Sequence, residues 1–101
     1  MNSRIPVHLA NLGHAYARNG NRSEALKVLA QLRTLSKTRY VSPYAFALVY
    51  IGMAETEKAF EWLQRAVTER SQAITTLKVD PVFDDLRGDP RFVSLIRQIG
   101  L

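Results

Sequence analysis

Residues 9–37 read LANLGHAYARNGNRSEALKVLAQLRTLSK, and residues 43–71, PYAFALVYIGMAETEKAFEWLQRAVTERS, repeat their pattern 34 positions later without a gap. In each copy a small residue stands three before a tyrosine, a second small residue follows nine after it, and leucine follows four later. This constant offset predicts two structural units of one kind. The aligned pairs are Leu12 with Phe46, Gly13 with Ala47, Tyr16 with Tyr50, Ala25 with Ala59, Leu29 with Leu63, and Leu32 with Ala66.

The first copy, Leu9-x-x-Leu12-Gly13-x-x-Tyr16 followed by Ala25-x-x-x-Leu29, resembles the tetratricopeptide repeat, a 34-residue helix–turn–helix unit. The resemblance covers about two thirds of the chain and lacks the family's tryptophan and closing proline. It implies an all-α fold with two antiparallel helix pairs in a right-handed α-solenoid. It also implies that Gly13 faces Ala25 and that Ala47 faces Ala59, since small residues let paired helices approach closely.

Local signals predict where the four helices begin and end. Apolar residues at helical spacing predict helices over about 6–19, 22–36, 43–52 and 57–70. Gly20 is expected to end the first helix in the left-handed conformation, and Asn21 and Glu24 to form a reciprocal cap on the second. Ser42 and Pro43 should begin the third helix. The second helix should bury Ala25, Leu26, Leu29 and Leu32.

The 34-residue pattern stops after Ser71, and two short helix starts follow. Asp80-Pro81-Val82-Phe83 and Asp89-Pro90-Arg91-Phe92 each place a capping aspartate before a proline that suits a first helical turn. Helical repeat arrays need a cap over their last apolar face. We therefore predict one domain over 1–101: repeat one at about 6–37, repeat two at about 42–71, and a helical capping tail at about 72–101. Phe83, Leu86, Phe92, Leu95 and Ile96 should cover repeat two.

Residues 58–63, 77–81 and 86–92 are also similar to the carboxyl ends of large bacterial proteins in which tetratricopeptide repeats follow a signalling or regulatory domain. This resemblance implies that the chain is the C-terminal part of a longer protein. Its first helix would then expose an edge that normally meets a preceding repeat.

The amino-acid composition and the motif content limit the classes of function and location expected for this chain. The chain has no cysteine and no membrane-length apolar run, and its start lacks the apolar core of a signal peptide, so we expect a cytoplasmic protein. No catalytic motif or phosphate-binding loop is present, and His8 and His14 lie on different sides of a helix. We therefore predict no enzyme activity, no cofactor, no metal and no membrane partner.

The net charge of +5 is uneven, since residues 1–40 hold seven Lys or Arg and one acidic residue. These basic residues are scattered along the hairpin. A solvated surface is therefore the favoured reading, and a weak contact with nucleic acid is the third functional hypothesis.

The leading hypothesis is a protein-interaction scaffold, the interaction arm of a larger bacterial signalling protein, which binds a protein or peptide in the concave groove of its first helices. In the family that groove is lined by first-helix residues. Self-association into a homodimer or longer stack through the exposed N-terminal repeat edge is the alternative. Carried over to this chain, the groove residues are Asn11, His14, Arg18, Tyr44, Leu48 and Ile51.

Overall fold

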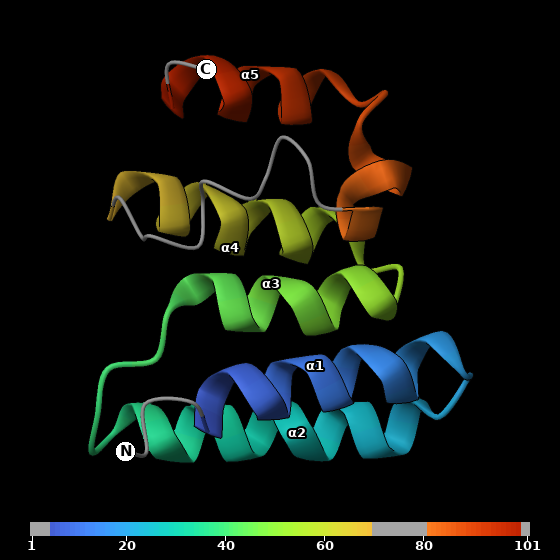
Figure 1. Cartoon of the computed structure of the whole chain (residues 1–101), viewed down its shortest axis with the longest axis vertical. Helices are drawn as coiled ribbons and strands as arrows, with labels where there is room; N and C mark the ends of the chain where they lie inside the picture. The colour runs from blue at the N-terminus through green and yellow to red at the C-terminus, as the bar shows by residue number, and fades with distance from the viewer. Residues whose placement is uncertain (1–4, 70–80, 100–101) are drawn as a thin grey trace.

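A computed structural model describes residues 5–69 and 81–99, which are helical and contain no strand. The described residues form five α-helices and one short 3-10 helix (Figure 1). The all-α class predicted from the sequence is confirmed. The helices are α1 (Ile5–Arg18), α2 (Arg22–Ser36), α3 (Pro43–Gly52), α4 (Thr56–Thr68) and α5 (Pro90–Ile99), with the 3-10 helix η3 (Pro81–Leu86) before α5.

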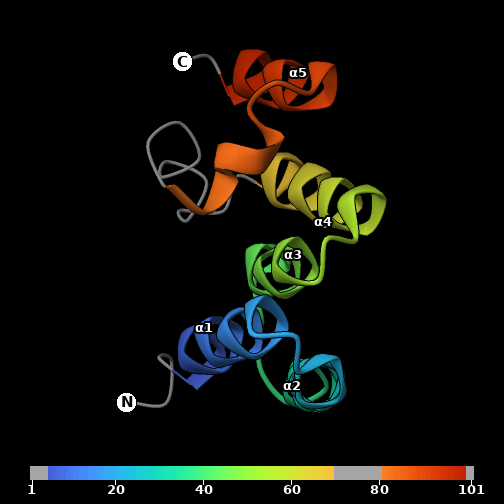
Figure 2. The same cartoon turned by 90° about the vertical axis from the view of Figure 1, so that its right-hand side faces the viewer.

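The helices pack as successive neighbours in the order α2, α1, α3, α4, α5. α1 packs against α2 and also against α3, α3 packs against α4, and α4 packs against α5. Figure 2 shows α1 and α2 side by side at one end of the molecule and α5 at the other. The short helix η3 contacts α3. The chain thus builds two helix pairs and then places its tail over the second pair.

Both turns within the helix pairs close with the same backbone motif. After α1, the Gly20 N–H donates to the Ala17 carbonyl at 3.0 Å and the Asn21 N–H to the Tyr16 carbonyl at 2.8 Å. After α3, Ala54 and Glu55 make the corresponding bonds. This Schellman arrangement requires a positive φ, which is 80° at Gly20 and 60° at Ala54. The two residues are 34 positions apart, so the repeat extends to the turn geometry.

The side-chain caps predicted from the sequence are present at α3 and α5 but not at α2. The Ser42 hydroxyl accepts a hydrogen bond from the Tyr44 N–H at 3.2 Å, as a helix cap before Pro43 should. Asp89 caps α5 by accepting a hydrogen bond from the Arg91 N–H at 2.8 Å. The Arg91 guanidinium also donates to the Asp89 carboxylate, and this side-chain bond, with the backbone bond, lowers the pKa of Asp89. The reciprocal cap predicted for Asn21 and Glu24 is wrong. Asn21 makes no side-chain capping bond, and the Glu24 carboxylate accepts from Lys27 instead.

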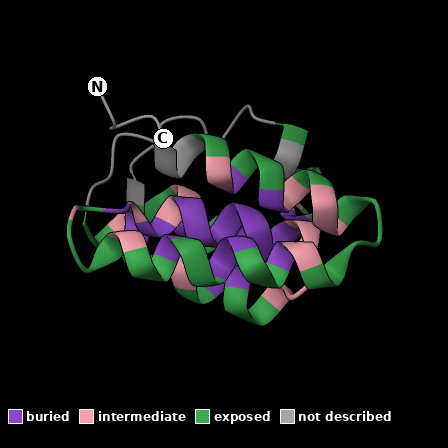
Figure 3. Cartoon of the chain, turned by 90° about the horizontal axis from the view of Figure 1, so that it is seen from below, coloured by how far each residue is buried: buried purple, intermediate pink, exposed green. Residues whose placement is uncertain are grey.

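The core runs between the layers and follows the aligned positions of the repeat. Figure 3 shows buried residues along the inner faces of the helices and exposed residues along the outer faces. The buried repeat positions are Gly13, Ala25, Leu29, Leu32, Phe46, Ala47, Tyr50, Ala59, Leu63 and Ala66. Tyr16 is half-buried. The repeat position Leu12 is 46% exposed, and Leu26, which was predicted to be buried, is 48% exposed.

Gly13 lies where three helices meet. A Cβ built on it would come within 2.9 Å of Val28 Cγ1 on α2 and within 2.9 Å of Val49 Cγ2 on α3. The sequence predicted a small residue here to allow close packing of helices, and these distances agree with that reason. The neighbours are valines of both α2 and α3, so Gly13 serves the contact between pairs as well as the contact within its own pair.

The tail forms the two short helices predicted from its Asp-Pro starts. Phe83, Leu86, Phe92 and Leu95 are buried, and Ile96 is half-buried against the core. Asp80, the first predicted cap, lies outside the described residues. Between α4 and α5, the Gln64 and Gln98 side-chain amides exchange two hydrogen bonds of 2.8 and 3.1 Å. The described tail therefore covers the last helix pair with an apolar inner face.

Ala54→Gly should stabilise the protein. An L-residue with φ near 60° carries a steric cost of about 1–2 kcal/mol that glycine avoids, while glycine loses about 0.5–1 kcal/mol of unfolded-state entropy. We expect a net gain of about 0.5–1 kcal/mol, measured by urea unfolding. Gly20→Ala, at the aligned position, is the matched control and should lower stability. A gain from both substitutions would contradict this account.

Candidate protein-interaction surface

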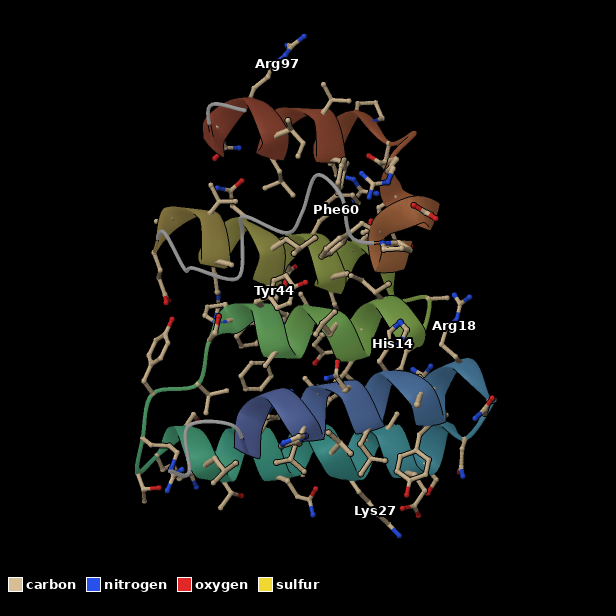
Figure 4. All side chains as sticks on the ribbon, in the orientation of Figure 1. His14, Arg18, Lys27, Tyr44, Phe60 and Arg97 are labelled. Carbon is tan, nitrogen blue, oxygen red and sulfur yellow. The ribbon has the colours of Figure 1, made fainter. Side chains whose placement is uncertain are left out.

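The three groove residues predicted on α1 differ in how far solvent reaches them. Asn11 and Arg18 are exposed and His14 is half-buried. Figure 4 shows His14 between α1 and α3, and Arg18 farther along α1 beside the turn that joins α3 to α4. His14 borders the end of α3, where a Cβ at Gly52 would lie 2.8 Å from the His14 carbonyl oxygen and 3.1 Å from its Cδ2. His14 is therefore part of a packing contact.

The groove residues predicted on α3 are not open. Leu48 and Ile51 are 8% and 6% exposed, and Tyr44 is half-buried. The Tyr44 ring meets the Phe83 ring of η3 edge to face, with centroids 5.8 Å apart and planes at 66°. This departs from the sequence prediction, which placed Leu48 and Ile51 as apolar anchors for a partner. The sequence predicted that the tail covers repeat two, but it did not predict that Phe83 contacts the groove residue Tyr44.

A different apolar surface is open at the end of the molecule formed by α1 and α2. We call it the edge surface. Leu12 is 46% exposed, and Leu9 and Tyr16 are half-buried on the same side of α1. A surface groove of about 420 Å³ continues from Leu9 onto α2. The edge surface comprises Leu9, Leu12 and Tyr16 of α1 and Ala30, Gln31, Thr34 and Leu35 of α2.

The second repeat shows what covers these positions when a neighbour is present. Leu12 aligns with Phe46, which is only 3% exposed, and Tyr16 aligns with the buried Tyr50. Arg33 of α2 donates to the Tyr50 hydroxyl at 3.4 Å, which places α2 beside that position of α3. The Phe46 ring also stacks on Trp62 at 4.2 Å. These two positions are therefore more exposed in repeat one than in repeat two.

The charge near the edge surface is balanced. The Lys27 ammonium donates to the Glu24 carboxylate at 2.9 Å, and this hydrogen bond raises the pKa of Lys27. Tyr16 is close enough to add to the same shift. The neighbouring polar side chains on α2 are neutral Gln31 and Thr34. The residues that form the edge surface are therefore apolar or neutral polar.

A second and larger cleft, of about 620 Å³, lies between α4 and α5. Its basic side chains are engaged by the protein itself: Arg91 lies 4.5 Å from the Phe60 ring centroid and pairs with Asp89 at 3.0 Å. Arg65 lies 4.6 Å from the Trp62 ring centroid. These groups already have partners within the protein. We therefore interpret the side chains that line this cleft as part of the contact between α4 and α5.

The basic residues of the first helix pair are partly used within the fold. Arg22 forms an ion pair with Glu55 across the two pairs, Lys27 pairs with Glu24, and Arg33 donates to Tyr50. These contacts spread the charges over different sides of α2. This distribution favours the interpretation of these basic residues as a solvated surface over a continuous basic surface that contacts nucleic acid.

Among residues 5–69 and 81–99, no three His, Asp or Glu side chains gather to hold a metal ion. Across the same residues, no helix combines the length and apolar character needed to cross a membrane. No protein-family model, curated protein or solved structure matches the chain significantly.

Proposed function

We propose that this chain is a non-enzymatic protein-interaction module of the tetratricopeptide-repeat type, and that its working surface is the edge surface. The repeat assignment is supported by the 34-residue sequence period and by two helix pairs that follow it. It is further supported by Schellman turns at the aligned Gly20 and Ala54. In this proposal the pairs stack as a right-handed solenoid and the tail is its C-terminal cap.

One observation supports the choice of the edge surface as the interaction surface. The repeat places apolar residues of one kind at equivalent positions of α1 and α3, and only the α3 set is covered. Leu12 is 46% exposed whereas Phe46 is 3% exposed. Exposed apolar surface is a candidate interaction site. An interaction partner would bury it.

The sequence-based groove hypothesis keeps Asn11, His14 and Arg18 on α1 as polar contacts at the side of the same helix. Its α3 half has less support, because Leu48 and Ile51 are buried and Tyr44 contacts the tail. We extend the proposal to a cytoplasmic interaction arm of a longer signalling or regulatory protein. The absence of cysteine suits a reducing compartment.

A photo-crosslinking amino acid placed at Leu12 tests this function in the native cell. We expect a discrete adduct with a protein, identified by mass spectrometry and then reproduced with the purified partner. Val93 on α5 is the matched control, because it is an apolar residue with 44% exposure at the opposite end of the molecule. If Leu12 and Val93 give the same adducts, or neither gives one, the edge surface is not the working surface.

A further inference from the structure

We infer that residues 81–99 are a third repeat whose first helix has contracted to η3, and that this contraction closes the array at its C-terminal end. The residue pattern hides this unit, because Pro81 and Asp84 stand at the positions of the small residue and the tyrosine. It becomes visible in where the tail helices begin, end and pack. The inference goes beyond the proposed function and does not depend on which surface binds a partner.

The boundaries of the tail helices continue the 34-residue period. The helices α1, α3 and η3 end at Arg18, Gly52 and Leu86. The helices α2, α4 and α5 begin at Arg22, Thr56 and Pro90. Each step in both series is 34 residues. The tail therefore places a helix end and a helix start where a third repeat would place them.

The helix α5 lies on α4 in the register of the repeat. The two helices run in the same direction (Figure 1). The side chains of Gln64 and Gln98, which are 34 positions apart, exchange hydrogen bonds of 2.8 and 3.1 Å. Glu57 and Arg91, another pair with this separation, line the cleft between the same helices. Equivalent positions of two successive second helices therefore lie close together.

The tail makes the contacts of a first helix, but it divides them between two elements. The first helix of repeat two, α3, packs against α1 and also contacts α2. One repeat later, η3 contacts α3 and α5 contacts α4. Because η3 has six residues, fewer than the ten of α3, it leaves the surface of α4 to α5. A further repeat therefore has no open surface on which to pack as α3 packs on repeat one.

The inward face of α5 has changed with its neighbour. Ala25 and Ala59, at the fourth position of α2 and α4, are fully buried in helices that pack against α1 and α3. The aligned residue of α5 is Val93, which is 44% exposed. The residues of α5 that are buried are its neighbours Phe92 and Leu95. Val93 therefore occupies the position that a complete first helix would cover.

Restoring the first helix tests the inference. In the restored chain, the sequence of residues 43–55 replaces residues 77–89, which keeps the chain length and the 34-residue register. Thr76 then precedes the new helix as the capping Ser42 precedes α3. The control chain carries one additional alanine between positions 89 and 90, which turns α5 by about 100° relative to the new helix. Circular dichroism measures the helix content of both chains.

A single thiol reports whether the new helix covers α5. The protein has no cysteine, so Val93→Cys can be followed by its rate of reaction with a soluble disulfide reagent. We expect this rate to fall about ten-fold in the restored chain relative to the parent, and to stay high in the control chain. Gln98→Cys is the matched position, because Gln98 and the aligned Gln64 are both exposed, and its rate should not change.

If the restored chain does not fold, a double-mutant cycle in the parent chain decides. Gln64→Ala and Gln98→Ala should be coupled by about three- to ten-fold in the unfolding equilibrium constant, since either change removes the same pair of hydrogen bonds. Gln64→Ala and Arg97→Ala should be additive, because Arg97 points away from the molecule (Figure 4). Additive effects of Gln64 and Gln98 would overturn the inference. So would equal thiol rates at position 93 in the parent and in a folded restored chain, or equal protection in the control chain.

Discussion

Phe83→Ala should lower the free energy of unfolding by about 3–5 kcal/mol, the usual cost of removing a fully buried phenylalanine side chain. The Phe83 side chain is completely buried, with Tyr44 of α3 at 5.8 Å and Phe92 of α5 at 6.0 Å between ring centroids. The ring therefore joins the tail to the second helix pair. A small domain has about 5–15 kcal/mol of stability in total, so this one change would remove a large share of it.

Urea unfolding followed by circular dichroism measures the effect. Val93→Ala is the control: it lies in the same tail but is 44% exposed, and it should change stability by less than about 0.5 kcal/mol. A loss at Phe83 no larger than at Val93 would mean that the tail rests on the repeats without stabilising them. In that case the cap interpretation would fail, because a cap must share the cooperative unfolding of the array.

Gly13→Ala should destabilise the protein by about 1–3 kcal/mol, although alanine is the better helix former by about 1 kcal/mol. The added methyl group would lie 2.9 Å from Val28 Cγ1, 2.9 Å from Val49 Cγ2 and 3.1 Å from Val28 Cβ. Valine side chains are restricted at χ1 and cannot easily turn away. To remove this steric overlap, α1 would have to move away from α2 or α3. The α1–α2 and α1–α3 contacts would then pack less tightly.

The control for this prediction is Gly88→Ala, because a Cβ at Gly88 meets nothing within 4 Å. A double-mutant cycle identifies the cause. If overpacking is responsible, Gly13→Ala should cost less in a Val28→Ala background than in the parent, since the closest methyl group is then absent. A stabilising effect of Gly13→Ala in the parent protein would show that the three helices are not in close contact at this point.

The candidate site differs from the one expected from the sequence for a physical reason. The repeat pattern identifies which side of each helix is apolar, but the same pattern is present whether or not a neighbouring helix covers that side. Leu12 and Phe46 occupy one repeat position and differ in exposure because α3 packs against α1, α2 and α4, whereas the main contacts of α1 are with α2 and α3. Leu48 and Ile51 were expected to face a partner, but the residues around them leave little of either exposed.

The amino-acid sequence by itself determined the helical class, the α2 boundaries, the cap at Ser42, the turn at Gly20 and the two short helices of the tail. These features depend on local chemistry: apolar spacing, a capping hydroxyl, a left-handed glycine and Asp-Pro starts. Only the tertiary structure decided the exposure of Leu12 and Leu26, the burial of Leu48 and Ile51 and the left-handed Ala54. Those features depend on which distant segments meet, since burial is a property of neighbours and a strained turn is imposed by the packing of the helices it joins.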